Sequence, residues 1–342
     1  MKRAVAMLVG FLIATAASAA GPFFLDHNGV LWSASADLNG LHLTGESGGT
    51  VVASSTIPFP YGAPGTNDTA IQVAADETTG KVAVVWQRNW GAGLSDVMLA
   101  VWQNGQWETV QTLDEDSSSN PRFPVVRVAQ AADTVPDPAD PTDPARATVV
   151  KDSFLEMVWW EGVADQQHGM LAIWQLTATS SDQALAFKGN LDRFVFSGVP
   201  DSATVPNSVI EHPQFAAQSV TSDALAFFAS QHTGLFYLLR IGFTLTAPTT
   251  TADGGMTAAT QRGRHIPIFG LTRVFPLTPS INMEGARVIL GADLNPVAYR
   301  VNGPMIQYVT YGDGGWSPAR TLAVTNGLTL DQAIPLVEDL AH

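Results

Sequence analysis

Short apolar runs separated by turn residues recur along most of the chain, and the clearest examples are residues 70–113 and 287–322. In both segments the apolar runs follow one another in the same order, and a tryptophan opens the last run. Asn104-Gly105 and Asn302-Gly303 separate two of the runs. Asn-Gly between apolar runs is a strong hairpin signal, because type I′ turns need a positive φ at both central positions. The pattern predicts a four-stranded antiparallel meander as the repeating unit.

Weaker copies of this unit occur at residues 23–53, 121–174 and 213–239. Together they make about five units, and their uneven spacing leaves room for a sixth between Thr244 and Met283. Self-similarity of this kind is typical of repeat architectures, and radial closure of small sheets leaves only short, protected edges. We therefore predict an all-β fold, a β-propeller of about five four-stranded antiparallel blades. A β-sandwich and a β-helix remain as alternatives, because periodicity does not distinguish radial from stacked packing.

One segment, Ala131 to Ala147, departs from the apolar pattern by repeating aspartate and proline. Proline has no backbone N–H, so such a run lacks the donors that a strand needs. We predict an exposed loop, inserted between the first two strands of its unit.

The N-terminus has the three parts of a secretory signal peptide. Lys2 and Arg3 supply the positive end, Ala4 to Ala17 are nearly all apolar, and Ala17-Ser18-Ala19 fits a cleavage site. The apolar run is short for a membrane span, and no later stretch resembles one. We predict that residues 1–19 are removed, and that residues 20–342 form a single propeller domain in the periplasm or outside the cell.

Composition narrows the classes of function. The chain has no cysteine, which excludes disulfides, a thiol nucleophile and thiolate metal sites. Its formal net charge is -14 with only 17 lysines and arginines, so the positive surface that nucleic acids or anionic membranes require is missing. We therefore expect neither partner.

The order of features in the two clearest units resembles the repeats of sialidase-like and lectin-like β-propellers: an apolar run ending in tryptophan, a polar turn, a second apolar run, Asn-Gly, tryptophan and a leucine-terminated strand. The resemblance covers most of the mature chain at the level of the repeat. It implies a ligand site on one face or in a central funnel, and such families include glycosidases, lyases and non-catalytic glycan-binding proteins. Thr310 to Trp316 has aspartate at the wrong offset for an Asp-box, and no arginine triad or Tyr–Glu pair is matched, so sialidase activity is not predicted.

Trp159-Trp160-Glu161 is the most notable cluster, because aromatic rings beside a carboxylate can stack a sugar ring and bind its hydroxyls. Trp86 occupies the equivalent place in the preceding unit. We take Trp159, Trp160 and Trp86 as candidate ligand-binding residues. Their recurrence in successive units equally fits packing between blades, so the structural interpretation stays open.

Glu161, Glu211 and Asp26 are the first candidates for catalysis if the protein is an enzyme, because each lies near a strand start or end in a different unit. Glycoside hydrolysis needs two carboxyl groups roughly 5 to 10 Å apart. A Gly-x-Ser-x-Gly match at residues 45–49 precedes a β run instead of a helix, so we interpret it as a hairpin turn.

No metal site or cofactor is predicted. The histidines lack the spacing of transition-metal ligands. The loop Asp114-Glu115-Asp116 offers oxygen ligands for Ca²⁺ but lacks the glycine-spaced order of calcium loops, and a solvated turn fits it as well.

These observations favour an exported, non-catalytic binding or structural protein that engages a glycan or a protein at the cell surface through a propeller face. Two alternatives stay open. One is a propeller glycoside hydrolase or lyase acting on an extracellular polysaccharide, and the other is a self-assembling surface subunit.

Overall fold

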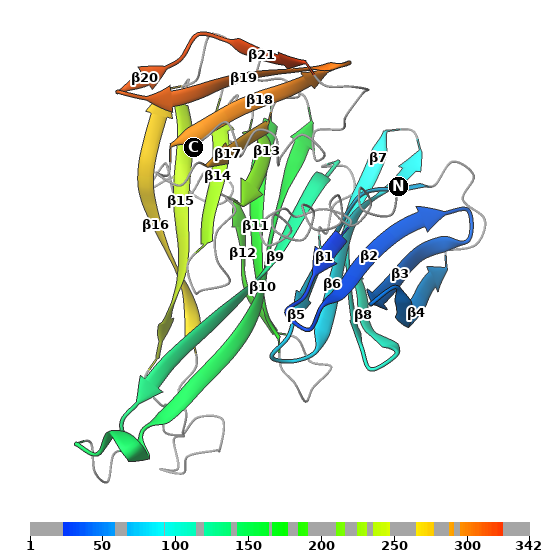
Figure 1. Ribbon diagram of the computed structural model, residues 1–342, viewed down its shortest axis with the longest axis vertical. Coiled ribbons are helices and arrows are strands. Elements are labelled where there is room, and N and C mark those ends of the chain that lie inside the picture. Colours follow the sequence, from blue (N-terminus) through cyan, green and yellow to red (C-terminus); the bar gives the residue numbers. More distant parts are fainter. Residues whose placement is uncertain are drawn as a thin grey trace.

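The computed structural model describes residues 23–58, 67–91, 93–113, 120–137, 142–163, 166–176, 184–190, 210–215, 224–230, 235–246, 265–276, 287–290 and 295–323. Within these residues the chain is all-β, with a single 3₁₀ turn, η2 (Pro144–Arg146), and no α-helix (Figure 1). None of the described residues forms a helix long and apolar enough to span a membrane.

The described strands form five antiparallel sheets, which we number I to V in chain order. Sheet I contains β1 (Phe23–Leu25), β2 (Val30–Asp37), β3 (Gly40–Ser47) and β4 (Thr50–Pro58). Sheet II contains β5 (Asn67–Asp76), β6 (Lys81–Gly91), β7 (Leu94–Gln103) and β8 (Gln106–Thr112). Sheet III contains β9 (Arg122–Val135), β10 (Thr148–Val163), β11 (Gln166–Leu176) and β12 (Ala184–Asn190).

Sheet IV contains β13 (Ile210–Phe215), β14 (Ala224–Ser230), β15 (Leu235–Leu245) and β16 (His265–Pro276). Sheet V contains β17 (Arg287–Leu290), β18 (Pro296–Asn302), β19 (Met305–Gly312), β20 (Gly315–Trp316) and β21 (Arg320–Ala323). In sheets I to IV each strand pairs with the next one in sequence, which confirms the predicted meander.

Two hairpin turns show why the sequence pattern succeeds. Asn104 and Gly105, between β7 and β8, have φ values of 51° and 86°, as a type I′ turn requires. Gly48 and Gly49 link β3 to β4 with φ values of 56° and 80°. The Gly-x-Ser-x-Gly match at residues 45–49 therefore includes a hairpin turn, as predicted.

The stretch that left room for a sixth unit contains β16. This strand pairs with β15 along its length and completes sheet IV as the fourth strand. The described residues between Thr244 and Met283 thus form no sheet of their own.

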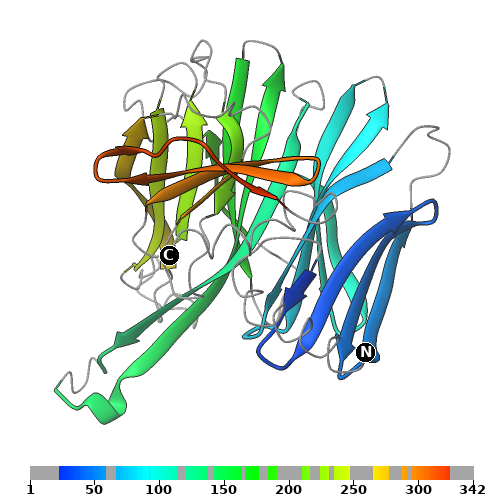
Figure 2. The ribbon, with the colours of Figure 1, turned by 45° about the horizontal axis from the view of Figure 1, so that its top comes forward.

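Sheets I to IV pack in chain order, each against the next (Figures 1 and 2). The first strand of each sheet lies against the sheet before it: β5 contacts β1 and β2, β9 contacts β5 and β6, and β13 contacts β9 and β10. Contacts between the described strands of sheet V and the other four sheets are sparse. Closure of a ring, which a propeller requires, stays a prediction.

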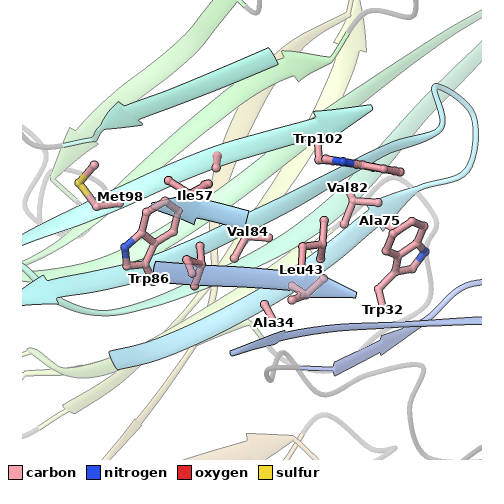
Figure 3. Packing of buried hydrophobic residues seen from close by; sticks show 13 residues of the cluster. Trp32, Ala34, Leu43, Ile57, Ala75, Val82, Val84, Trp86, Met98 and Trp102 are labelled. Atoms are coloured by element: carbon pink, nitrogen blue, oxygen red, sulfur yellow. The ribbon is translucent and has the colours of Figure 1, made fainter. Parts of the chain in front are cut away.

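β6 is apolar on both faces, because it lies between two other sheets. Val82, Val84 and Trp86 pack against sheet I, and Figure 3 shows this cluster around Trp86 and Trp102. Val85, on the opposite face of the strand, packs against sheet III. Strands buried on both faces lose the usual alternation of apolar and polar residues, which explains the continuous apolar run of β6.

β10 repeats this arrangement one sheet further along. Leu155 and Trp159 pack against sheet II, whereas Phe154 and Val158 pack against sheet IV. All four are fully buried. Burying one such side chain contributes about 1.5 to 3 kcal/mol, so β6 and β10 together hold sheets I to IV in place.

Sheet I differs because only one of its faces is packed against another described sheet. Trp32, Leu41 and Leu43 are buried against sheet II. The opposite face is mainly polar, with exposed or half-buried side chains such as Ser35 and Thr44, but it also carries the exposed Phe23 and Leu31. A closed ring would have to pack sheet V against this polar face.

The Asp/Pro segment is shorter than predicted. Ala131–Val135 continue β9 and pair with Thr148–Asp152 of β10, so the prediction of a loop across 131–147 was wrong at its start. These five residues contain no proline and keep their backbone donors, and the prolines begin at Pro136. The lengthened β9–β10 hairpin extends beyond the rest of sheet III (Figures 1 and 2).

His265, at the start of β16, ties this hairpin to sheet IV. Its ring nitrogens Nδ1 and Nε2 lie 2.7 Å from Asp152 Oδ2 and 3.1 Å from Asp133 Oδ2. Its backbone N–H also donates to Asp152 Oδ2 at 3.0 Å. The side chain is almost fully buried, so sheets III and IV are joined by polar contacts as well as by apolar packing.

The core between sheets II and III predicts that the same substitution, leucine to alanine, changes stability very differently at a buried and at an exposed position. Leu155→Ala should destabilise the fold by about 2 to 5 kcal/mol, because it leaves a cavity between sheets II and III. Leu38→Ala removes a side chain that is 98% exposed and should change stability by less than about 0.5 kcal/mol. Urea denaturation of the two variants measures both effects. Equal midpoints for the two variants would contradict the packing described.

Candidate functional site

The two ends of the stacked sheets carry different groups of polar residues. At one end, the β1–β2 turn of sheet I meets the β5–β6 turn of sheet II, where His27 Nδ1 lies 2.5 Å from Glu77 Oε1. Gln130 of β9 reaches the same region and donates to Asp76 Oδ1 at 3.1 Å. We call this the Asp76 end. The opposite end, called the Trp90 end, contains the start of β5, the end of β6 and the start of β7.

The predicted catalytic carboxylates lie at different ends. Asp26 is in the turn at the Asp76 end, where it accepts hydrogen bonds from Trp32 Nε1 at 3.0 Å and from the backbone of Val30 at 2.9 Å. Glu161 is at the end of β10. Ser153 pairs with Gln130 at the Asp76 end, and Glu161 lies roughly 26 Å further along the strand at ~3.3 Å per residue.

Asp26 and Glu161 therefore do not come within the distance that glycoside hydrolysis needs. Glu211, the third candidate, belongs to β13 and pairs with Ala229 in sheet IV. The Glu211 side chain falls outside the described part of the structure.

The three tryptophans predicted to bind ligand all have buried rings. Trp86 and Trp159 are fully buried, and Trp160 is 7% exposed. Trp86 pairs with Met98, and Trp159 pairs with Met170. The two therefore occupy matching positions in sheets II and III, as the alignment of the two units indicated. Their surroundings are those of packing residues.

Glu161 and Trp160 make contacts that fix the end of β10. Trp159 Nε1 donates to Glu161 Oε2 at 3.0 Å. The Arg122 guanidinium lies over the Trp160 ring, 4.3 Å from its centroid, in a cation–π contact. Burial lowers the pKa of Arg122 from its usual value.

The Trp90 end also contains a group of residues that sequence analysis did not identify. Arg88 lies between Asp68 of β5 and Asp96 of β7, directly opposite both in the strand register. Its Nε and Nη2 donate to the two oxygens of Asp68, each at 2.9 Å. The Arg88 and Asp68 side chains are 6% and 0% exposed, so this is a buried bidentate ion pair.

Trp90 completes this group on the same face of β6. Its Nε1 donates to Asp96 Oδ2 at 2.5 Å, and the Arg88 guanidinium is 5.7 Å from its ring centroid. The Arg88 guanidinium also lies over the ring of Trp86. Trp86 is buried, whereas Trp90 is half-buried. The indole is thus held in one orientation and still reaches the surface. We call Asp68, Arg88, Trp90 and Asp96 the Trp90 site.

The other face of β6 at this end is lined by amides and hydroxyls. Asn89 Nδ2 donates to Thr69 Oγ1 at 3.0 Å, and Asn89 Oδ1 accepts from Gln87 Nε2 at 2.7 Å. Ser95 Oγ donates to the Pro121 carbonyl at 2.7 Å, which connects sheets II and III. Both faces of the Trp90 end are therefore polar and internally hydrogen-bonded.

Electrostatics limit what this end can bind. The Trp90 site has one guanidinium and two carboxylates, and Asp68 already neutralises the guanidinium. Among the described residues no group of His, Asp and Glu side chains is arranged to hold a metal ion. The Asp114–Asp116 loop, the candidate for Ca²⁺, lies outside the described residues.

A second polar cluster occurs on the outer face of sheet I. His42 Nε2 lies 2.8 Å from Asp37 Oδ1, and His42 Nδ1 lies 3.0 Å from Thr56 Oγ1. The hydrogen bond from His42 and that from the Asn39 backbone stabilise the carboxylate and lower the pKa of Asp37 to about 2.

Comparison with known proteins finds no matching family model and no matching curated sequence. Among solved structures, the fucose-specific lectin of Aleuria aurantia is 11% identical, with 90% of this chain and 76% of that chain covered and a TM-score of 0.33. A variant of that lectin in complex with alpha-methyl-L-fucoside gives 10% identity, 90% and 91% coverage and a TM-score of 0.27. The WD40 domain of SCAP from fission yeast is 8% identical, with 90% of this chain and 74% of that chain covered and a TM-score of 0.25. These TM-scores are too low to decide the fold or the ligand of this chain.

The buried ion pair predicts a strong effect of one substitution. Asp68→Asn removes the charge that compensates Arg88 and should destabilise the fold by about 3 to 5 kcal/mol. Exchanging both residues for apolar ones, as in Asp68→Leu with Arg88→Met, should cost less than the single change. Denaturation midpoints of the three proteins provide the measurement.

Asp143→Asn is the matched control, because Asp143 pairs with Arg146 at 3.5 Å and both side chains are exposed. Asparagine retains the capping hydrogen bond of η2, so the loss should stay below about 1 kcal/mol. If Asp68→Asn proved as mild as this control, the ion pair would not have the described role.

Proposed function

We propose that this chain is an exported, non-catalytic carbohydrate-binding protein, and that Trp90 is the platform on which a sugar ring stacks. The observation that carries the proposal is the fixed orientation of a half-buried indole between Arg88 and Asp96. Its partners hold the ring before any ligand arrives, which lowers the entropy cost of binding.

The chemistry of the Trp90 site fits a sugar. A pyranose ring presents C–H groups on its faces and hydroxyls at its rim. The indole face offers apolar contact, and the half-buried carboxylate of Asp96 is a hydrogen-bond acceptor beside it, whereas Asp68 is fully buried and serves to hold Arg88 in place. Because the local charge is not positive, the expected ligands are neutral glycans.

The proposed fold is a β-propeller with one blade per sheet. Its support is the meander order of sheets I to IV and the contact between the first strands of successive sheets. Sheet V would close the ring against the polar face of sheet I. Export is proposed from the N-terminal pattern of Lys2, Arg3 and the apolar run ending at Ala17.

The enzyme alternative has less support. Asp26 and Glu161 lie at opposite ends of the sheets, and each carboxylate accepts a hydrogen bond from a tryptophan N–H. Such contacts hold a carboxylate in a structural position. The case for a glycoside hydrolase or lyase would therefore need carboxylates other than these two.

Glycan binding by the Trp90 site predicts a specific loss. On a glycan array, and then by calorimetry with the best ligand, mature Trp90→Ala should bind at least about tenfold more weakly, because the stacking contact is lost. Trp90→Phe keeps an aromatic ring but lacks the N–H, so its affinity should lie between those of the parent and Trp90→Ala. Trp316→Ala, a half-buried tryptophan of sheet V, is the control and should bind like the parent.

Two results would contradict the proposal. One is a parent protein that binds no glycan on a broad array. The other is a folded Trp90→Ala variant whose affinity equals that of the parent, which would place the ligand elsewhere.

A further inference from the structure

The outer edge of sheet I lacks the charged residue that the outer edges of the other sheets have. The strand furthest along the chain in each of the other four sheets carries a charged residue: Glu108 in β8, Lys188 in β12, Arg273 in β16 and Arg320 in β21. Charged residues on edge strands discourage pairing with another chain. β4, with the sequence TVVASSTIP, contains none.

β4 is open for pairing within the described part of the chain. It is the last strand of sheet I and pairs only with β3. From Ala53 to Pro58 its register with β3 is regular, and Val52 is the extra residue of a bulge between Val51 and Ala53. Its free side therefore presents a regular row of backbone N–H and C=O groups.

The side chains of β4 favour pairing rather than hydration. Val51 and Val52 are each 56% exposed, so apolar surface lies at the edge itself. Most other residues of the strand are threonine, serine or alanine, and the β-branched ones have high strand propensity. An uncharged, β-prone edge of this kind is a site for strand addition.

We propose that β4 of one copy pairs antiparallel with β4 of a second copy, so that two sheets I join into one continuous sheet. A twofold contact requires a surface that is complementary to itself. β4 satisfies this because no charge would oppose a like charge across the pair. A formal charge of -14 makes most other surfaces of two copies repel each other, whereas β4 has no carboxylates.

The interface is small, so the dimer should be weak. A single pair of edge strands buries less than the roughly 1,200 to 2,000 Å² of a stable complex. The expected behaviour is a monomer in dilute solution and a dimer as the concentration rises. This inference is independent of glycan binding, since the Trp90 site lies on sheet II.

Sedimentation equilibrium of the mature protein over a range of concentrations tests the pairing. The parent should dimerise reversibly, and Val52→Lys should weaken dimerisation at least about tenfold, because it adds a charge to an edge strand that has none. Val110→Lys, a 46% exposed valine on β8, is the matched control and should dimerise like the parent. Circular dichroism confirms that each variant is folded.

A parent that stays monomeric up to millimolar concentration would overturn the inference. So would a dimer that persists unchanged in Val52→Lys, or one that Val110→Lys weakens equally.

Discussion

The burial of β6 and β10 on both faces is the constraint on which the rest of the structure depends. A strand that is apolar on both sides cannot end a stack, because each face needs another sheet to cover it. Trp86 and Val85 point to opposite neighbours of sheet II, and Trp159 and Phe154 do the same for sheet III. Sheets I to IV therefore assemble in chain order, and the polar face of sheet I marks one side where apolar packing ends.

Polar contacts between neighbouring sheets help to align them. His27 meets Glu77 between sheets I and II, Gln130 donates to Asp76 between sheets II and III, and His265 contacts two carboxylates of sheet III from sheet IV. Apolar faces alone would permit sliding between sheets. The buried His265 fixes the register most strongly, because a shift would leave its ring nitrogens without partners. The same register places the start of β7 beside the start of β9 and shapes the Trp90 end.

Sequence patterns predicted the strands well, because apolar runs and Asn-Gly turns report local geometry. The site was less predictable. Most of β5, a turn and most of β6 separate Asp68 from Arg88, so nothing local indicates their pairing. The spacing Trp86-x-Arg88-x-Trp90 is the one local signal, because alternate residues of a strand share a face. The aromatic cluster at Trp159 was visible in the sequence, but its burial is a long-range packing effect: sheet II covers Trp159, and sheet IV covers Trp160 on the opposite face of β10.

Amide hydrogen exchange followed by mass spectrometry tests the central role of the two-sided strands most directly. Exchange of a buried strand reports the free energy of the opening that exposes it. If β6 and β10 hold the layers together, their peptides should exchange most slowly, while those of β4 and β21 should exchange much faster. Peptides of β6 and β10 that exchange as fast as those of β4 would contradict a fold built around them.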